Sequence, residues 1–197
     1  MGSTSFLQQE LPEIIFERPM FYRNDKALRV ELGEGSFRES TYLPRVYEKA
    51  LTLFEALHDN TDELLLIVDH DEDKKIGVFS KYIKSKSLLY HLQHEVIQRL
   101  DEEELTTYRF ALHCKKQDIR YHALIKAICN QDLGMKPSVH QRVYFVNKTK
   151  KTVFYVYDDQ GCDIVATTLQ TLRPIYETFN DWLLDYDREQ MNKLFSK

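Results

Sequence analysis

Carboxylates in two short stretches are the residues of this chain whose type and spacing could do chemistry. Three lie in or just after the stretch Tyr157-Asp-Asp-Gln-Gly161, and two more begin the acidic run Asp69-His-Asp-Glu-Asp73. Carboxylate oxygens are the ligands that Mg²⁺ and Ca²⁺ prefer in proteins. They also meet basic side chains of protein partners through charge complementarity. The candidate binding residues are therefore Asp158, Asp159, Gln160, Asp163, Asp69 and Asp71.

Neither acidic stretch has a complete metal-binding pattern. The spacing Asp-x-Asp-x-Asp over 69–73 matches the first half of an EF-hand loop, but Gly77 comes too late for the sharp turn and no glutamate closes the loop. The turn 157–161 has an alternative interpretation as a structural corner, in which Asp158 bonds the turn backbone and Gly161 is left-handed. We therefore assign no metal ligand, no cofactor and no catalytic residue.

Two further patterns fall short of known sites. The stretch Gly33-Glu-Gly-Ser-Phe-Arg38 could aim backbone N–H groups at an anion, but it lacks the third glycine of the dinucleotide fingerprint and the Gly-Lys-Ser/Thr of a P-loop. His91, His94 and Glu95 do not have the His-Glu-x-x-His spacing that places two imidazoles on one helical face around zinc. A flexible turn and surface histidines are the simpler interpretations.

Length and composition predict one ordinary globular domain over residues 1–197, with residues 1–26 as an irregular segment packed on it. A net charge of -4 argues against nucleic-acid binding by bulk electrostatics and favours a basic protein partner. The three cysteines, Cys114, Cys129 and Cys162, are odd in number and lie in apolar surroundings, which predicts buried free thiols and a cytoplasmic location. We expect no export signal and no membrane span, because no window approaches the length of a spanning helix.

Hydrophobic periodicity predicts the elements that must position these residues. Alternation over 27–32 indicates a half-buried strand, the 3–4 spacing over 43–58 indicates a helix, and the apolar run 64–68 indicates a buried strand. This order is typical of a βαβ-like unit. A strand over 108–114 and a helix over 118–130 capped by Asp118 follow, whereas the pattern over 76–100 fits helix and strand equally.

The C-terminal part of the chain predicts an antiparallel meander followed by a helix. Strands over 143–146 and 153–157 form a hairpin, and the turn 157–161 joins it to a third strand over 162–166. Thr168 or Thr171 begins the last helix, and Trp182 is expected to anchor the core. The predicted fold is α/β, with α+β as the alternative: a single-domain mixed sheet of about five to seven strands with helices on both faces.

Several longer stretches resemble a family of uncharacterised bacterial proteins marked by a Tyr-Asp-Asp-Arg-Gly turn and described as having a Rossmann-like domain. The resemblance runs from about Phe21 to Phe195 and implies no established activity. Gln160 stands where that family usually has arginine, so a guanidinium clamp on an anion is not expected there. The matching stretches are Tyr22 to Leu32, Asp118-Ile-Arg-Tyr121, Val143-Tyr-Phe-Val-Asn147, Tyr157 to Ala166, Leu172-Arg-Pro-Ile-Tyr176 and Trp182 to Arg188.

Two functional hypotheses remain from the sequence. The first is a non-enzymatic cytoplasmic protein whose acidic turns bind a basic protein, as an immunity or antitoxin-type inhibitor would. The second is a metal-dependent hydrolase or phosphoryl-transfer enzyme with Asp158, Asp159 and Asp69 as oxygen ligands.

Overall fold

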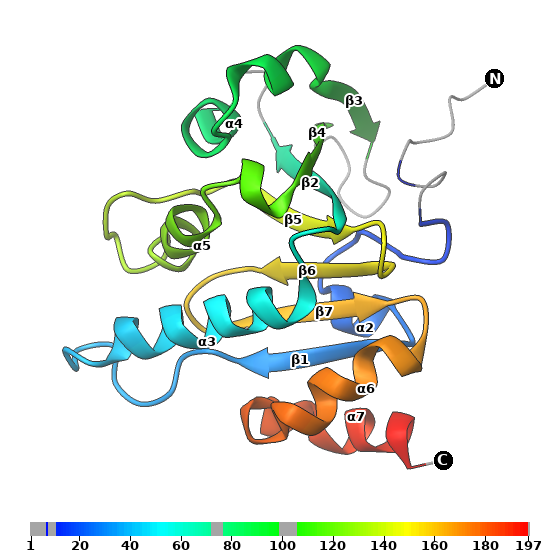
Figure 1. Ribbon diagram of the computed structural model, residues 1–197. Helices are drawn as coiled ribbons and strands as arrows, with labels where there is room; N and C mark the ends of the chain where they lie inside the picture. Colours follow the sequence, from blue (N-terminus) through cyan, green and yellow to red (C-terminus); the bar gives the residue numbers. More distant parts are fainter. Residues whose placement is uncertain (1–6, 8–10, 72–76, 99–105, 197) are drawn as a thin grey trace.

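A computed structural model of the chain describes residue 7 and residues 11–71, 77–98 and 106–196. Within these ranges the chain forms one seven-stranded sheet with the order β1-β7-β6-β5-β2-β4-β3 and with helices packed on it (Figure 1). The strands are β1 (Ala27–Glu31), β2 (Glu63–His70), β3 (Gln93–Gln98), β4 (Thr106–Lys115), β5 (Arg142–Asn147), β6 (Thr152–Val156) and β7 (Gly161–Ala166). The α-helices are α2 (Met20–Arg23), α3 (Tyr42–Leu57), α4 (Gly77–Tyr82), α5 (Tyr121–Cys129), α6 (Leu169–Thr178) and α7 (Arg188–Phe195). Short 3-10 segments are η1 (Lys86–His91), η2 (Lys116–Asp118), η3 (Asn180–Trp182) and η4 (Asp185–Asp187).

The pairings between neighbouring strands of this sheet are all antiparallel. Four successive antiparallel steps give β1 and β2 the same direction, and α3 carries the chain across the three strands between them. The predicted α/β fold, with its helices and its meander β5-β6-β7 followed by α6, is confirmed. The sheet is antiparallel in all its described pairings and not mixed as predicted. A Rossmann-type sheet is built from parallel strands, so the Rossmann-like domain implied by the resemblance is not confirmed.

Two faces with different chemistry result from the alternation of side chains along the strands. The register places Arg29, Asp163 and Tyr155 on one face. The same face continues through Tyr144 to the pair formed by Asp69 and Arg109. The N-terminal segment 14–24, including α2, covers this polar face and lies behind the sheet in Figure 1. Charged side chains are thereby buried on a sheet face that is usually apolar.

The opposite face is apolar and carries α3, α5 and α6 (Figure 1). Helix α3 forms because its apolar residues recur at 3–4 spacing, and Pro44 occupies its first turn, where the missing N–H is harmless. Phe54 on its buried side packs edge-on against Phe145, with ring centroids 5.0 Å apart, and stacks on His58 at 4.2 Å. The residues at the end of α3 therefore belong to the centre of the core.

Two local predictions are wrong, and one alternative that the sequence left open is resolved. Asp118 does not cap α5: its carboxylate accepts the Lys115 N–H at 2.8 Å and belongs to η2, and α5 begins at Tyr121. Trp182 packs half-buried at the rim of the core against Phe179 rather than inside it, because η3 lies at the surface. The ambiguous stretch 76–100 contains both structure types, α4 and η1 followed by β3, in the part of it that the structure describes.

All three cysteines are buried free thiols, as predicted. Burial raises the pKa of Cys114 and of Cys129 to about 12, so both sulfur atoms are protonated at neutral pH. Among the described residues, no helix combines the length and apolar character that crossing a membrane requires.

His58 makes folding sensitive to acid. Its ring is fully buried, Nδ1 contacts the Phe54 carbonyl oxygen at 2.8 Å, and burial lowers its pKa to about 4. As pH falls below 6.5, His58 becomes protonated in the unfolded state, whereas in the folded state it stays neutral down to about pH 4. The free energy of unfolding therefore decreases as pH falls through this window. We expect a loss of about 2 kcal/mol between pH 7 and pH 5 in urea unfolding followed by circular dichroism.

The His58→Phe variant, which keeps the ring stack, should remove most of this loss. The exposed His122→Phe should retain the wild-type dependence on pH. An unchanged pH profile in His58→Phe would show that another group causes the acid sensitivity.

Candidate functional site

The turn between β6 and β7 holds three of the sequence-predicted binding residues. Asp158 Oδ1 accepts the backbone N–H of Gln160 at 2.7 Å and that of Gly161 at 3.3 Å. Burial raises the pKa of the Asp158 carboxyl, and these two hydrogen bonds act in the opposite direction. Asp158 therefore stabilises the turn backbone, as the structural-corner interpretation predicts.

Gly161 is needed for space and not for a left-handed backbone, which corrects the expectation from the sequence. Among the described glycines only Gly35 and Gly134 have positive φ. A Cβ on Gly161 would lie 2.3 Å from the Tyr157 hydroxyl and 2.8 Å from the Val30 carbonyl oxygen. The side chain of Tyr157 thus folds back over the first residue of β7.

Gln160 connects the turn to the glycine-containing stretch that follows β1. Its carbonyl oxygen accepts the N–H of Leu32 at 2.8 Å and that of Gly33 at 3.3 Å. Gly33 is close-packed here, because a Cβ would lie 2.2 Å from the Tyr42 hydroxyl and 2.8 Å from the Asp159 carbonyl oxygen. The turn 157–161 and the start of the stretch 33–38 are therefore packed against each other, at the end of the sheet where β1 and β6 end.

Asp159 is directed into the protein at this junction. Its Oδ2 accepts the Tyr42 hydroxyl at 2.6 Å and the Gln160 side-chain amide at 3.1 Å. Burial and then the bond to Asp159 raise the pKa of Tyr42, so the phenol stays protonated and donates. Asp159 thereby attaches the first residue of α3 to the β6–β7 turn.

Asp163 lies on the other face of the sheet, away from the turn. It accepts Arg29 Nε at 2.8 Å and Nη2 at 3.3 Å, and its Oδ2 also accepts the Phe21 N–H. Asp187 completes the group, with Oδ2 3.5 Å from Arg29 Nη1 and Oδ1 accepting the Tyr22 hydroxyl at 2.8 Å. Burial opposes the charge on Arg29, but its bonds to Asp163 outweigh this effect and raise its pKa.

Asp69 and Asp71 lie at the end of β2 and are paired with arginines of the two flanking strands. Asp69 and Arg109 form a buried bidentate pair, with both N–O distances at 2.7 Å. Asp71 accepts Arg142 Nη2 at 2.6 Å and Nη1 at 3.1 Å. Such fork-shaped pairs fix both partners in orientation as well as in charge.

The six predicted residues thus lie in three separate places. These are the β6–β7 turn, which contacts the start of α3, the Arg29 group on the opposite face of the sheet, and the end of β2. The other acids of the run, Glu72 and Asp73, lie outside the described residues. Within the described ranges, no group of three or more His, Cys, Asp or Glu side chains is placed to hold a metal ion. The sequence interpretation missed Arg29, Tyr42 and Asp187, although a lone charge inside an apolar strand, such as Asp163, already requires a buried partner.

The Gly161→Ala variant should destabilise the protein by about 2 kcal/mol, because the added methyl overlaps both the Tyr157 hydroxyl and the Val30 carbonyl oxygen. Gly77→Ala is the control, since a Cβ there meets nothing within 4 Å. Urea unfolding of both variants measures the effect. Equal stability of the two would contradict the close packing at Gly161.

The Asp163→Asn variant should lower the free energy of unfolding by about 3 kcal/mol, because it leaves the buried Arg29 cation with the more distant Asp187 alone. Asp185→Asn removes an exposed partner of Arg188 and should change stability by less than about 1 kcal/mol. Chemical denaturation of the two variants provides the comparison. A similar small effect at both positions would show that the Arg29 group contributes little.

Comparisons with known proteins show which family the chain belongs to. The family model described as "Domain of unknown function (DUF3885)" matches residues 3–187. The "Uncharacterized protein YnaE" of Bacillus subtilis (strain 168) is 31% identical over 160 residues, which cover 72% of this chain and 74% of that protein. No solved structure matches the chain. The chain belongs to the DUF3885 family.

Proposed function

We propose that this protein is a non-enzymatic cytoplasmic binding module that takes an extended segment of a basic protein at β3, the open edge of its sheet. An immunity or antitoxin-type inhibitor would act in this way. The observation that carries the proposal is the contrast between the two edges of the sheet, β1 and β3. The protein closes one edge with its own chain and leaves the backbone of the other without a described pairing partner.

The closed edge is β1. The N–H of Leu184 donates to the Arg29 carbonyl oxygen at 3.0 Å, and Leu183 forms an antiparallel bridge with Val30. On the same strand the Arg29 N–H contacts Met191 Sδ at 3.2 Å. The segment that leads into α7, together with α7 itself, therefore occupies the outward N–H and carbonyl oxygen of Arg29 in the middle of the strand, which would otherwise be open to another chain.

The open edge is β3. Among the described residues only β4 pairs with it, and its six residues contain neither proline nor lysine, the usual protection of an exposed edge. Val96 on this strand is 56% exposed, and Tyr90 in the preceding η1 is 90% exposed. An edge strand without a described partner is the arrangement used in strand addition, where backbone bonds provide affinity and side chains provide specificity. Exposed aromatic side chains are frequent anchors at protein interfaces.

Charge supports a basic partner. The chain has a net charge of -4, and the one charged residue of β3 is Glu95, whose side chain is 3.9 Å from Arg109. A basic partner would be attracted over long range and would meet no lysine on the edge itself. We propose that the predicted carboxylates stabilise the fold and do not contact the partner directly, because each already binds a group of this chain. They are Asp158, Asp159, Asp163, Asp69 and Asp71.

Binding to products of genes adjacent to this one tests the proposal. Each purified product is titrated against the wild type by biolayer interferometry, at two salt concentrations. We expect one basic product to bind, more weakly at high salt. Val96→Lys and Tyr90→Ala should weaken it at least tenfold, which corresponds to about 1.4 kcal/mol.

The control variant is Tyr186→Ala, because Tyr186 is 87% exposed in η4, beside the closed edge. It should bind as the wild type does. Equal binding by all variants, or no binding by any neighbouring gene product, would refute the proposal. A dimer in light scattering that Val96→Lys converts to a monomer would assign the edge to a second copy of this chain instead.

A further inference from the structure

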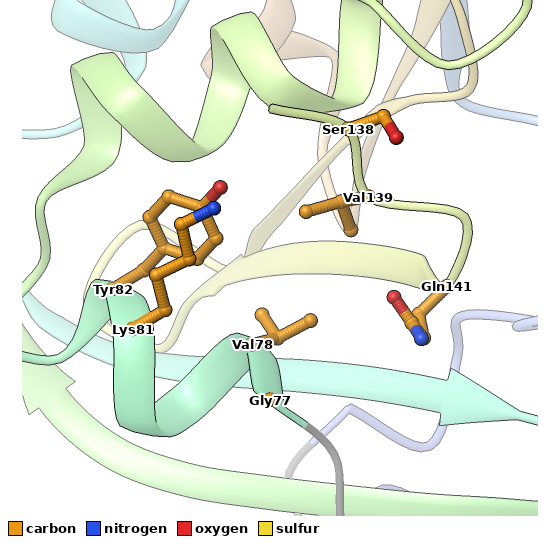
Figure 2. Close-up of a pocket in the computed structure, with 7 residues that line it drawn as sticks. All are labelled: Gly77, Val78, Lys81, Tyr82, Ser138, Val139 and Gln141. Atoms are coloured by element: carbon orange, nitrogen blue, oxygen red, sulfur yellow. The ribbon is translucent and has the colours of Figure 1, made fainter. Parts of the chain in front are cut away.

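A hollow of about 230 Å³ lies between α4 and the loop before β5. Figure 2 shows Val78, Lys81 and Tyr82 on the α4 wall, opposite Val139 and Gln141 on the loop wall, and Ser138 belongs to the same loop. The volume equals that of roughly eight water molecules at about 30 Å³ each. It is large enough for a small metabolite and too small for a dinucleotide.

Tyr82 is the unusual member of this lining. Its side chain is only 2% exposed, and its hydroxyl has no hydrogen-bond partner among the described residues. A buried hydroxyl without a partner destabilises a protein by about 1–3 kcal/mol. Natural structures rarely retain such a group unless a water, an ion or a ligand satisfies it.

One lysine lines the hollow, and two further nitrogen-bearing side chains contact its Ser138. Lys81 Nζ lies 5.2 Å from the centroid of the Tyr82 ring, Lys136 Nζ donates to Ser138 Oγ at 2.9 Å, and His140 Nε2 lies 3.2 Å from the same oxygen. Neither lysine forms an ion pair with a carboxylate in the described ranges. Donors without acid partners, in a chain that is negative as a whole, favour an anion at this place.

Both walls of the hollow are held in position by the same part of the chain. The Arg120 N–H, next to the start of α5, donates to the Tyr82 carbonyl oxygen at 2.8 Å, and the Val139 N–H donates to the Ala127 carbonyl oxygen of α5 at 2.9 Å. The Asn130 side chain, at the end of α5, also donates to the Pro137 carbonyl oxygen. The geometry of the lining is therefore fixed before any ligand enters, which reduces the entropy lost on binding.

We propose that this hollow binds a small oxyanion, the carboxylate or phosphate group of a small metabolite. Lys81 supplies the charge, and the hydroxyls of Ser138 and Tyr82 supply hydrogen bonds. The apolar side chains of Val78 and Val139 contact the carbon skeleton. This site is separate from the β3 edge, so a ligand here does not require the protein partner.

Isothermal titration of the full chain with inorganic phosphate and, separately, with sodium acetate tests the site, each at constant ionic strength with chloride as the balancing anion. We expect saturable binding of at least one probe, and the one that binds identifies the oxyanion class. Lys81→Met should weaken that binding about tenfold. Tyr82→Phe should weaken it several-fold while melting at or above the wild-type temperature in probe-free buffer, because it removes a buried hydroxyl without a partner.

Lys126→Met is the matched control. Lys126 is an exposed lysine whose Nζ lies 5.3 Å from the Tyr47 ring, the same arrangement as Lys81 over Tyr82 at a different place. It should bind the probe as the wild type does. No saturable binding of either probe, or equal weakening in Lys81→Met and Lys126→Met, would overturn the site. Equal affinity of Tyr82→Phe and wild type would overturn the role of the hydroxyl.

Discussion

The burial of charge on one face of the sheet is the constraint on which the rest of the structure depends. Arg29 with Asp163, and Arg109 with Asp69, lie between strands and under a covering segment, where an unpaired charge is strongly unfavourable. Each pair therefore needs further donors or acceptors, which come from the Phe21 N–H and from Asp187 at the Arg29 group. The N-terminal segment and the segment before α7 are thereby fixed to the sheet by the groups they must satisfy.

The same principle accounts for the turn between β6 and β7. Asp158 satisfies the turn backbone, and Asp159 and Gln160 attach the turn to the start of α3 and to the end of β1. Close approach of these segments is possible because Gly33 and Gly161 have no side chain. The motif that is conspicuous in the sequence is thus a junction of three elements. Its acidic composition follows from the number of donors that meet there.

The two surfaces proposed for function, the β3 edge and the hollow beside α4, lie apart from the buried ion pairs. The segment at Leu183 and Leu184 covers the β1 edge, whereas β3 exposes Val96 and has no pairing partner on its outer side among the described residues. The hollow beside α4 differs in kind, because it is lined by the Tyr82 hydroxyl and by Lys81, and among the described residues the first has no hydrogen-bond partner and the second no acid partner. An open edge favours a macromolecule and surplus donors favour an anion, so the two surfaces suit different ligands.

The sequence by itself determined the local elements and their order. The periodicity over 43–58, the meander from 143 to 166 and the buried cysteines are encoded in short windows, and the structure agrees with them. It also placed a turn at 157–161 with Asp158 bonding its backbone. Only the tertiary structure decided what the other carboxylates do. Arg29 and Asp163 are 134 residues apart in the chain, and Tyr42 and Asp159 are 117 apart. Local spacing carries no information on such pairings, because they depend on strand order and register, which the whole core selects.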